Sequence, residues 1–181
     1  MRAVIHSRSF ALALVVLAAA ASRLLPHPPN FTPIAAMALF GGAHFADRRQ
    51  AFLVPLGVMA LSDLVIGLHQ LVPVVYGSFA LIVGIGLWLR TRRTPATIAA
   101  AAIASSVVFF LITNFGVWAL GSWYPKTAAG LLAAYVAAVP FFRNTLAGDL
   151  FYTAVLFGGF ALLGRLFPSL REAHPGAAGL R

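Results

Sequence analysis

Cysteine is absent from the 181 residues of the chain, and charged residues make up only 9% of it. Without cysteine, disulfides, thiolate nucleophiles and thiolate metal ligands are excluded. Aspartate and glutamate together number four, so a catalytic set of paired carboxylates is not expected. No HExxH, P-loop or G-x-S-x-G motif occurs either. The sequence therefore does not predict an enzyme, and the chain is not expected to hydrolyse ATP by itself.

What the chain has in abundance is apolar residues, which make up 61% of it and give a mean hydropathy of +0.91. A chain of this size cannot bury so much apolar surface in one aqueous core. Lipid is the expected solvent, and only helices or a closed barrel can cross it. Apolar runs such as AFLVPLGVMALSDLVIGL, residues 51–68, lack the alternation of barrel strands. The sequence predicts an all-α integral membrane protein, with residues 1–181 as a single transmembrane domain.

A bundle of six membrane spans is predicted, near residues 9–25, 33–46, 51–68, 73–89, 96–120 and 145–167. The second span is short against the ~20 residues that cross a bilayer. A further apolar segment, residues 127–142, contains Pro140 near its end and is interpreted as an interfacial or re-entrant helix before the last span. If this segment crossed the membrane, the chain would have seven spans. As another alternative, residues 1–21 resemble a cleavable signal peptide, whose removal would leave five.

Basic residues predict the orientation of these spans. Only Arg23, Lys126 and Arg143 fall on one side of the six-span arrangement. The other side carries Arg2, Arg8, Arg48, Arg49, Arg90, Arg92, Arg93, Arg165, Arg171 and Arg181. The positive-inside rule then places both termini in the cytoplasm, with the chain as a multi-pass protein of a bacterial inner membrane. The net charge of +9 is explained in this way, and no nucleic-acid partner is expected.

Polar and aromatic residues collect on the side with few basic residues, in loops 24–32, 69–72 and 121–144 and at the adjoining span ends. Ligand sites are concave and combine apolar walls with a few convergent polar groups. An outward-facing ligand pocket is therefore predicted here. The candidate ligand-binding residues are His27, Pro28, Asn30, Phe31, His69, Tyr76, Asn114, Trp118, Trp123, Tyr124, Arg143, Asn144, Asp149 and Tyr152.

Some of these candidates have an alternative, structural interpretation. Trp123 and Tyr124 are typical of the aromatic belts at membrane interfaces. Asn114 suits either an interhelical hydrogen bond or a contact with ligand. Arg143 and Asp149, six residues apart, could form a local ion pair that anchors the loop instead of bordering a pocket. The sequence leaves these alternatives open.

Five segments of the chain together resemble a known group of membrane proteins. They are RLLPHPPNFTPIAAMALFGGA (23–43), SDLVIGLHQ (62–70), VYGSFALIVGIG (75–86), FFLITNFGVW (109–118) and PFFRNTLAGDLFY (140–152). As a set they resemble the substrate-binding S components of energy-coupling-factor (ECF) vitamin transporters, in particular the BtuM-like cobalamin group. The resemblance implies a six-helix fold with an outward vitamin pocket formed by the first, third and fifth loops. The implied function is uptake of cobalamin or a related corrinoid, with no cofactor of the chain's own.

The resemblance also implies partners, namely a transmembrane coupling subunit with its ATPases, although solitary members are expected as well. The first helix offers only Ala18 and Ser22 at the spacing of the usual docking pattern. Ala80 occupies the position where the resemblance would place a cobalt-ligating cysteine, so that His27 or His69 becomes the candidate for contact with cobalt. Neither histidine has a third partner for a metal site of its own. The alternatives are an S component for a different vitamin or precursor, and a membrane-embedded enzyme or accessory protein of cofactor metabolism.

Overall fold

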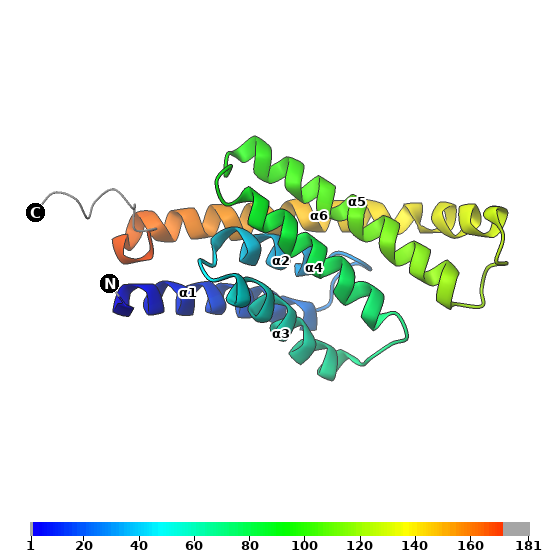
Figure 1. Cartoon of the computed structure of the whole chain (residues 1–181), viewed down its shortest axis with the longest axis horizontal. Helices are drawn as coiled ribbons and strands as arrows, with labels where there is room; N and C mark the ends of the chain where they lie inside the picture. The colour runs from blue at the N-terminus through cyan, green and yellow to red at the C-terminus, as the bar shows by residue number, and fades with distance from the viewer. Residues whose placement is uncertain (1, 172–181) are drawn as a thin grey trace, which may run out of the picture.

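The computed structural model describes residues 2–171 of the chain, with the surroundings of side chains described from Arg8 onward. This part is all-α, as predicted. It contains α1 (Arg2–Ala21), α2 (Ile34–His44), α3 (Arg48–Ile66), α4 (Val72–Leu89), α5 (Pro95–Leu120) and α6 (Ala128–Leu166), with the short 3-10 turns η1 (Ser22–Leu24) and η2 (Pro168–Leu170). The connections α1–α2, α3–α4 and α5–α6 lie at one end of the bundle, and α2–α3 and α4–α5 lie at the other (Figure 1).

The shortest helix, α2, lies at the centre of the bundle. All eleven of its residues are buried, and it packs against each of the other five helices. Eleven residues rise about 17 Å, which is too short to cross roughly 30 Å of hydrocarbon. The predicted second span at 33–46 is therefore corrected to a buried core helix. A helix buried in protein and a helix that faces lipid can have the same apolar composition. Composition alone therefore does not distinguish a core helix from a membrane span.

Four helices in the described part of the chain, α3, α4, α5 and α6, are long and apolar enough to cross a membrane. Their outward faces are apolar as well: Leu53, Leu64 and Val65 on α3 are each at least 70% exposed. A continuous apolar surface of this kind is normal where lipid covers it and rare on a soluble protein. The chain is a multi-pass membrane protein that associates with the lipid bilayer. Its described part contains six helices in all, four of them candidate spans, where the sequence predicts six spans and one additional helix.

The last helix, α6, is a single element of 39 residues that runs along the longest axis of the molecule (Figure 1). The prediction of a separate interfacial or re-entrant helix at 127–142, followed by a span at 145–167, is corrected by this continuity. Pro140 lies inside α6 and does not end it; proline is tolerated within membrane helices more readily than within soluble ones. At about 58 Å, α6 exceeds the hydrocarbon thickness, and its first turns project beyond α3 and α4.

Two arginines complete the hydrogen bonding of the carboxyl end of α2. The Arg90 side chain donates to the carbonyl oxygens of Gly42, Phe45 and Ala46, at 2.9, 2.5 and 3.3 Å. The Arg8 side chain donates to the carbonyl oxygens of His44, at 2.8 Å, and of Leu170. Terminal carbonyl groups of a helix have no partner within the helix, and the partial negative charge there favours cations. Arg8 and Arg90 thus anchor the buried helix as well as contributing positive charge to this end.

Candidate functional site

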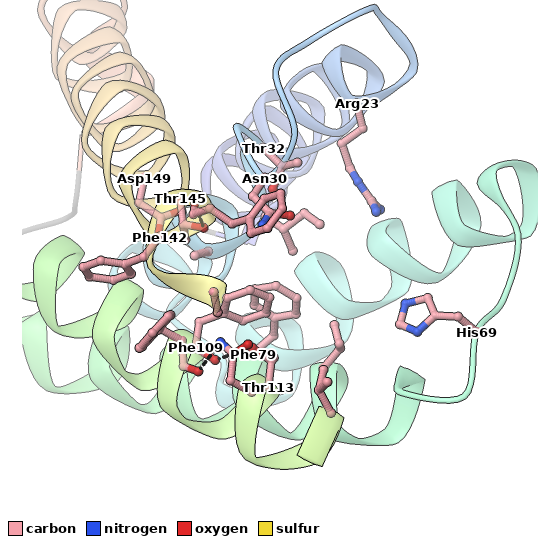
Figure 2. A pocket seen from close by; sticks show the side chains of 18 residues that line it. Arg23, Asn30, Thr32, His69, Phe79, Phe109, Thr113, Phe142, Thr145 and Asp149 are labelled. Carbon is pink, nitrogen blue, oxygen red and sulfur yellow. Dashed lines mark hydrogen bonds between the residues drawn. The ribbon is translucent and has the colours of Figure 1, made fainter. Parts of the chain in front are cut away.

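A cavity of about 370 Å³ lies at the end of the bundle that holds the α1–α2, α3–α4 and α5–α6 connections. It is bordered by the 22–33 connection, the first turn of α2, and α4, α5 and α6 (Figure 2). Asn30 and His69, which lie on two of the connections, are exposed at its rim, whereas Asp149 is only 3% exposed in its depth. The cavity therefore reaches from the loop end into the middle of the bundle.

Aromatic rings form two walls of this cavity. Phe79 of α4 and Phe109 of α5 stack with their ring centroids 5.0 Å apart and their planes 22° apart (Figure 2). Phe110 of α5 lies 4.9 Å from the ring of Phe142 of α6. Aromatic side chains bring a large contact area with few rotatable bonds. The walls of the cavity are thus largely aromatic and apolar.

Polar groups reach the cavity between these rings. Asn114 of α5 donates from Nδ2 to the carbonyl oxygen of Phe110 at 2.8 Å, so its amide oxygen remains as an acceptor. The Thr113 and Thr145 hydroxyls donate to carbonyl oxygens one turn earlier on their own helices. Such bonds satisfy the hydroxyl protons locally and leave oxygen lone pairs for another donor. The polar part of the wall is therefore rich in acceptors.

The charged residue at the other side of the cavity, Arg23 of η1, belongs to a hydrogen-bonded network. Its guanidinium forms an ion pair with Asp63 of α3 at 2.9 Å and contacts the hydroxyl of Ser62. The Tyr76 hydroxyl of α4 donates to the same carboxylate at 2.9 Å. The Arg23 and Asp63 side chains are only 11% and 12% exposed. This network ties η1, α3 and α4 together beside the cavity and neutralises the arginine.

The 22–33 connection is held against α6 by both polar and apolar contacts. The Asn144 amide donates to the carbonyl oxygen of Pro29 at 3.0 Å. The ring of Phe31 lies 5.6 Å from that of Tyr152. A Cβ at Gly148 would come within 3.1 Å of the Phe31 Cα, so only glycine allows this approach without a shift. These contacts fix the position of Asn30, whose φ of 62° lies in the left-handed region that asparagine tolerates.

A second hollow, of about 390 Å³, adjoins the cavity at the loop end. The two share His69 and Val117 in their walls. The hollow is otherwise lined by Gln70 and Leu71 of the α3–α4 connection and by the end of α5 up to Trp123, which is 85% exposed. It forms a shallow, mostly apolar surface outside the deep cavity.

The structure brings together four of the predicted ligand-binding residues in the wall of the cavity: Asn30, His69, Asn114 and Asp149. Trp123 joins His69 at the adjoining hollow. The cavity borders the α1–α2 and α3–α4 connections and the end of α5 that leads into the α5–α6 connection. The sequence places these three connections on one side of the membrane. The predicted location of a concave site therefore agrees with the geometry of the bundle.

Four other predicted residues serve contacts beside the cavity, not in its wall. Phe31, Tyr76, Asn144 and Tyr152 make the packing and hydrogen-bonding contacts described above. Ala80 follows Phe79 on α4 and is half-buried. These positions support the cavity wall without reaching its interior.

The remaining predicted residues lie at the loop end. His27 and Pro28 are exposed, and the His27 imidazole contacts the carbonyl oxygen of Pro28. Trp118 donates from its indole nitrogen to the carbonyl oxygen of Pro125 at 2.9 Å, and Tyr124 is half-buried in the same connection. No group of three or more histidine, cysteine or acidic side chains able to hold a metal occurs in residues that the structure describes.

The alternative of a local ion pair between Arg143 and Asp149 is wrong. Arg143 is exposed and Asp149 is buried, and the carboxylate instead accepts a hydrogen bond from Ser106 of α5 at 2.6 Å. Because α6 is continuous, residues six positions apart point in different directions around the helix axis. Asp149 thus belongs to the interior of the bundle.

Most of the aromatic wall is not predicted from the sequence. Phe79, Phe109, Phe110, Phe141 and Phe142 line the cavity but were not among the predicted residues. Arg23, which the sequence indicates only as an orientation charge, also lines the cavity, as do Thr32, Thr113 and Thr145. The adjacent pairs FF at 109–110 and 141–142, close to the candidates Asn114 and Asn144, were the available signal.

A multi-pass α-helical membrane protein with a central buried helix and an internal cavity is thus the class that the fold defines. The chain belongs to a family of unknown function, DUF6580, whose model matches residues 4–170. A comparison with curated proteins and one with solved structures found no match.

Proposed function

We propose that the chain binds a vitamin or vitamin precursor in its internal cavity and takes part in uptake of that compound across the bacterial inner membrane. The observation that carries the proposal is the cavity itself, which combines aromatic walls with a few convergent polar groups, as small-molecule sites do. Its mouth lies at the end of the bundle with few basic residues, which the positive-inside rule assigns to the outer side. The sequence resemblance to S components of vitamin transporters supports uptake over other uses of a membrane pocket.

The size of the cavity favours a smaller ligand than cobalamin. At about 370 Å³, it lies near the lower end of the ~300–1,000 Å³ typical of ligand pockets. This volume suits a vitamin with one or two rings better than a corrinoid macrocycle with its side groups. A corrinoid would have to occupy the adjoining hollow as well. In that case His69, which lines both spaces, is better placed than His27 to approach cobalt.

The proposed role is that of a binding and uptake component, with no chemical step on the ligand. Transport would proceed with an ECF-type coupling subunit and its ATPases or by the chain alone. The residues proposed to hold the ligand are the aromatic pairs of α4, α5 and α6 together with Asn30, Asn114 and Asp149.

A pair of substitutions on α6 tests binding in the cavity. Ala138 lines the cavity, whereas its neighbour Ala137 is exposed on the outside of the helix. We expect the purified protein to bind at least one compound from a panel of water-soluble vitamins and their precursors, cobalamin included, in isothermal titration calorimetry. Ala138→Phe fills the cavity and should weaken this binding about tenfold or more, whereas Ala137→Phe should not. If no compound binds, or if Ala138→Phe binds as wild type does, the proposed function is wrong.

The absence of native cysteine makes the proposed orientation directly testable. Single-cysteine variants Trp123→Cys and Arg49→Cys place a thiol at exposed positions on opposite ends of the bundle. In intact cells a membrane-impermeant maleimide should label the cysteine at position 123, and the cysteine at position 49 should react only after lysis. The unsubstituted chain, which has no thiol, gives the background. Labelling in the reverse pattern would place the cavity mouth in the cytoplasm and contradict uptake from outside.

A further inference from the structure

The carboxyl group of Asp149 lies in the depth of the cavity without a cationic partner. Asp149 is 3% exposed, and its side chain accepts a hydrogen bond from Ser106 at 2.6 Å. Ser106 itself is fully buried. In the described part of the chain, no lysine, arginine or histidine side chain lies within ion-pair distance of this carboxyl group. A buried charge is normally paired or held by several hydrogen bonds, because its removal from water is otherwise very unfavourable.

The other charged groups around the cavity do not satisfy Asp149. Arg23 lines the same space, but it forms its ion pair with Asp63 and is neutralised there. His69 lies at the exposed rim, on the α3–α4 connection. Ile34 and Ala35 begin α2 at the cavity wall, and the partial positive charge of a helix amino end favours an ionised carboxyl group nearby. The cavity thus contains a buried carboxyl group that accepts one hydrogen bond, from Ser106, and has no cationic partner among the described residues.

The walls near this carboxylate suit a positive charge as well. Phe79 with Phe109, and Phe110 with Phe142, present ring faces or edges to the cavity. An aromatic ring face attracts a cation, and the attraction strengthens where water is excluded. The side-chain oxygens of Asn114 and Thr145 add acceptors for N–H donors. A cationic ligand would pair with the ionised form of Asp149 and so favour that form, whereas a neutral or an anionic ligand supplies no such counter-charge.

We propose that the cavity recognises an organic cation, with a positively charged nitrogen group paired to Asp149 and a planar ring packed against the phenylalanine side chains of the wall. This inference rests on the proposed function, because it specifies the charge of the ligand that the same cavity takes. A protonated amine, an amidinium group or a positively charged ring nitrogen would meet the same requirement. The ion pair would form only when ligand is bound, so the ligand supplies the missing counter-charge.

Three probes of the same size and different charge test this inference: benzamidine, a cation at neutral pH, benzamide, which is neutral, and benzoate, an anion. We expect wild type to bind benzamidine about tenfold or more tightly than benzamide, and benzoate most weakly, as measured by isothermal titration calorimetry in detergent. Asp149→Asn should remove the preference for benzamidine, and Asp149→Glu should retain part of it. The matched control Asp47→Asn removes an acidic residue that caps α3 outside the cavity and should leave the preference intact.

The outcomes separate this inference from the proposed function. If wild type binds benzamide or benzoate as tightly as benzamidine, or if it binds none of the three, the inference is overturned even when a vitamin binds the cavity. A preference for benzamidine that persists in Asp149→Asn also overturns it. Should Asp149→Asn fail to fold, the ranking of the probes in wild type and its loss in Ala138→Phe still decide the question. Failure of the whole vitamin panel would instead count against the proposed function.

Discussion

Gly86→Ala is expected to lower the free energy of unfolding by about 3 kcal/mol, with a matching fall in the midpoint of thermal unfolding. A Cβ at Gly86 of α4 would lie 2.3 Å from the carbonyl oxygen of Leu39 and 2.9 Å from the Cα of Gly42, both on α2. These atoms are backbone, so no side chain can rotate to make room. Small residues let membrane helices approach closely, and the added methyl group would push α4 away from the central helix.

The same helix provides the control for this prediction. Gly84, two residues earlier, is exposed, and a Cβ there meets nothing within 4 Å. Gly84→Ala should leave stability unchanged or raise it by about 0.5–1 kcal/mol, because alanine is the better helix former. Both midpoints can be followed by far-ultraviolet circular dichroism of the detergent-solubilised protein. Equal midpoints for the two variants would show that α2 and α4 are not in close backbone contact.

The fold could be predicted from sequence at the level of solvent and secondary-structure class, but not at the level of the number of spans or the placement of the helices. Apolar runs and few charges indicated helices in lipid. Whether an apolar helix faces lipid or protein depends on its neighbours, and hydropathy is the same in both cases. For this reason α2 (Ile34–His44) was expected to span the membrane, although all its residues are buried by the other five helices. Pro140 likewise indicates a helix end from sequence, but α6 continues through it.

The candidate site could be predicted in part because helix direction alternates along the chain. Alternation places the first, third and fifth connections at one end, beside the cavity whose wall contains Asn30, His69, Asn114 and Asp149. The other residues predicted from sequence lie outside that wall. The aromatic wall depends on the rotation of each helix about its own axis, which apolar composition does not specify. The side chain of Phe79 thus lines the cavity while its neighbour Ala80, a sequence-based candidate, does not.

Arg90 has two roles, and the sequence indicates only one of them. Its charge fits the positive-inside pattern, as does that of Arg49. The Arg90 side chain also donates hydrogen bonds to the end of the central helix, at the carbonyl oxygens of Gly42, Phe45 and Ala46. The function of such an arginine depends on which carbonyl groups the fold brings within reach of its side chain.

Arg90→Met is expected to destabilise the protein by about 3 kcal/mol, because it leaves carbonyl groups of the α2 end without donors, each worth about 1–3 kcal/mol when buried. Arg90→Lys should have an intermediate effect, since a single ammonium group cannot reproduce the fork of guanidinium donors that reaches three acceptors. The measurement is again the midpoint of thermal unfolding in detergent.

Arg49→Met is the matched control for this last prediction, because it removes the same charge from the same end of the bundle at an exposed position. Surface substitutions of this kind usually change stability by less than about 0.5 kcal/mol. If Arg90 acted only through its charge, the two methionine variants would have the same midpoint. A lower midpoint for Arg90→Met, with the lysine variant between it and wild type, would instead show that the geometry of donation to α2 stabilises the fold. Because the first turn of α2 borders the cavity, loss of this anchor should also weaken ligand binding at the opposite end of the helix.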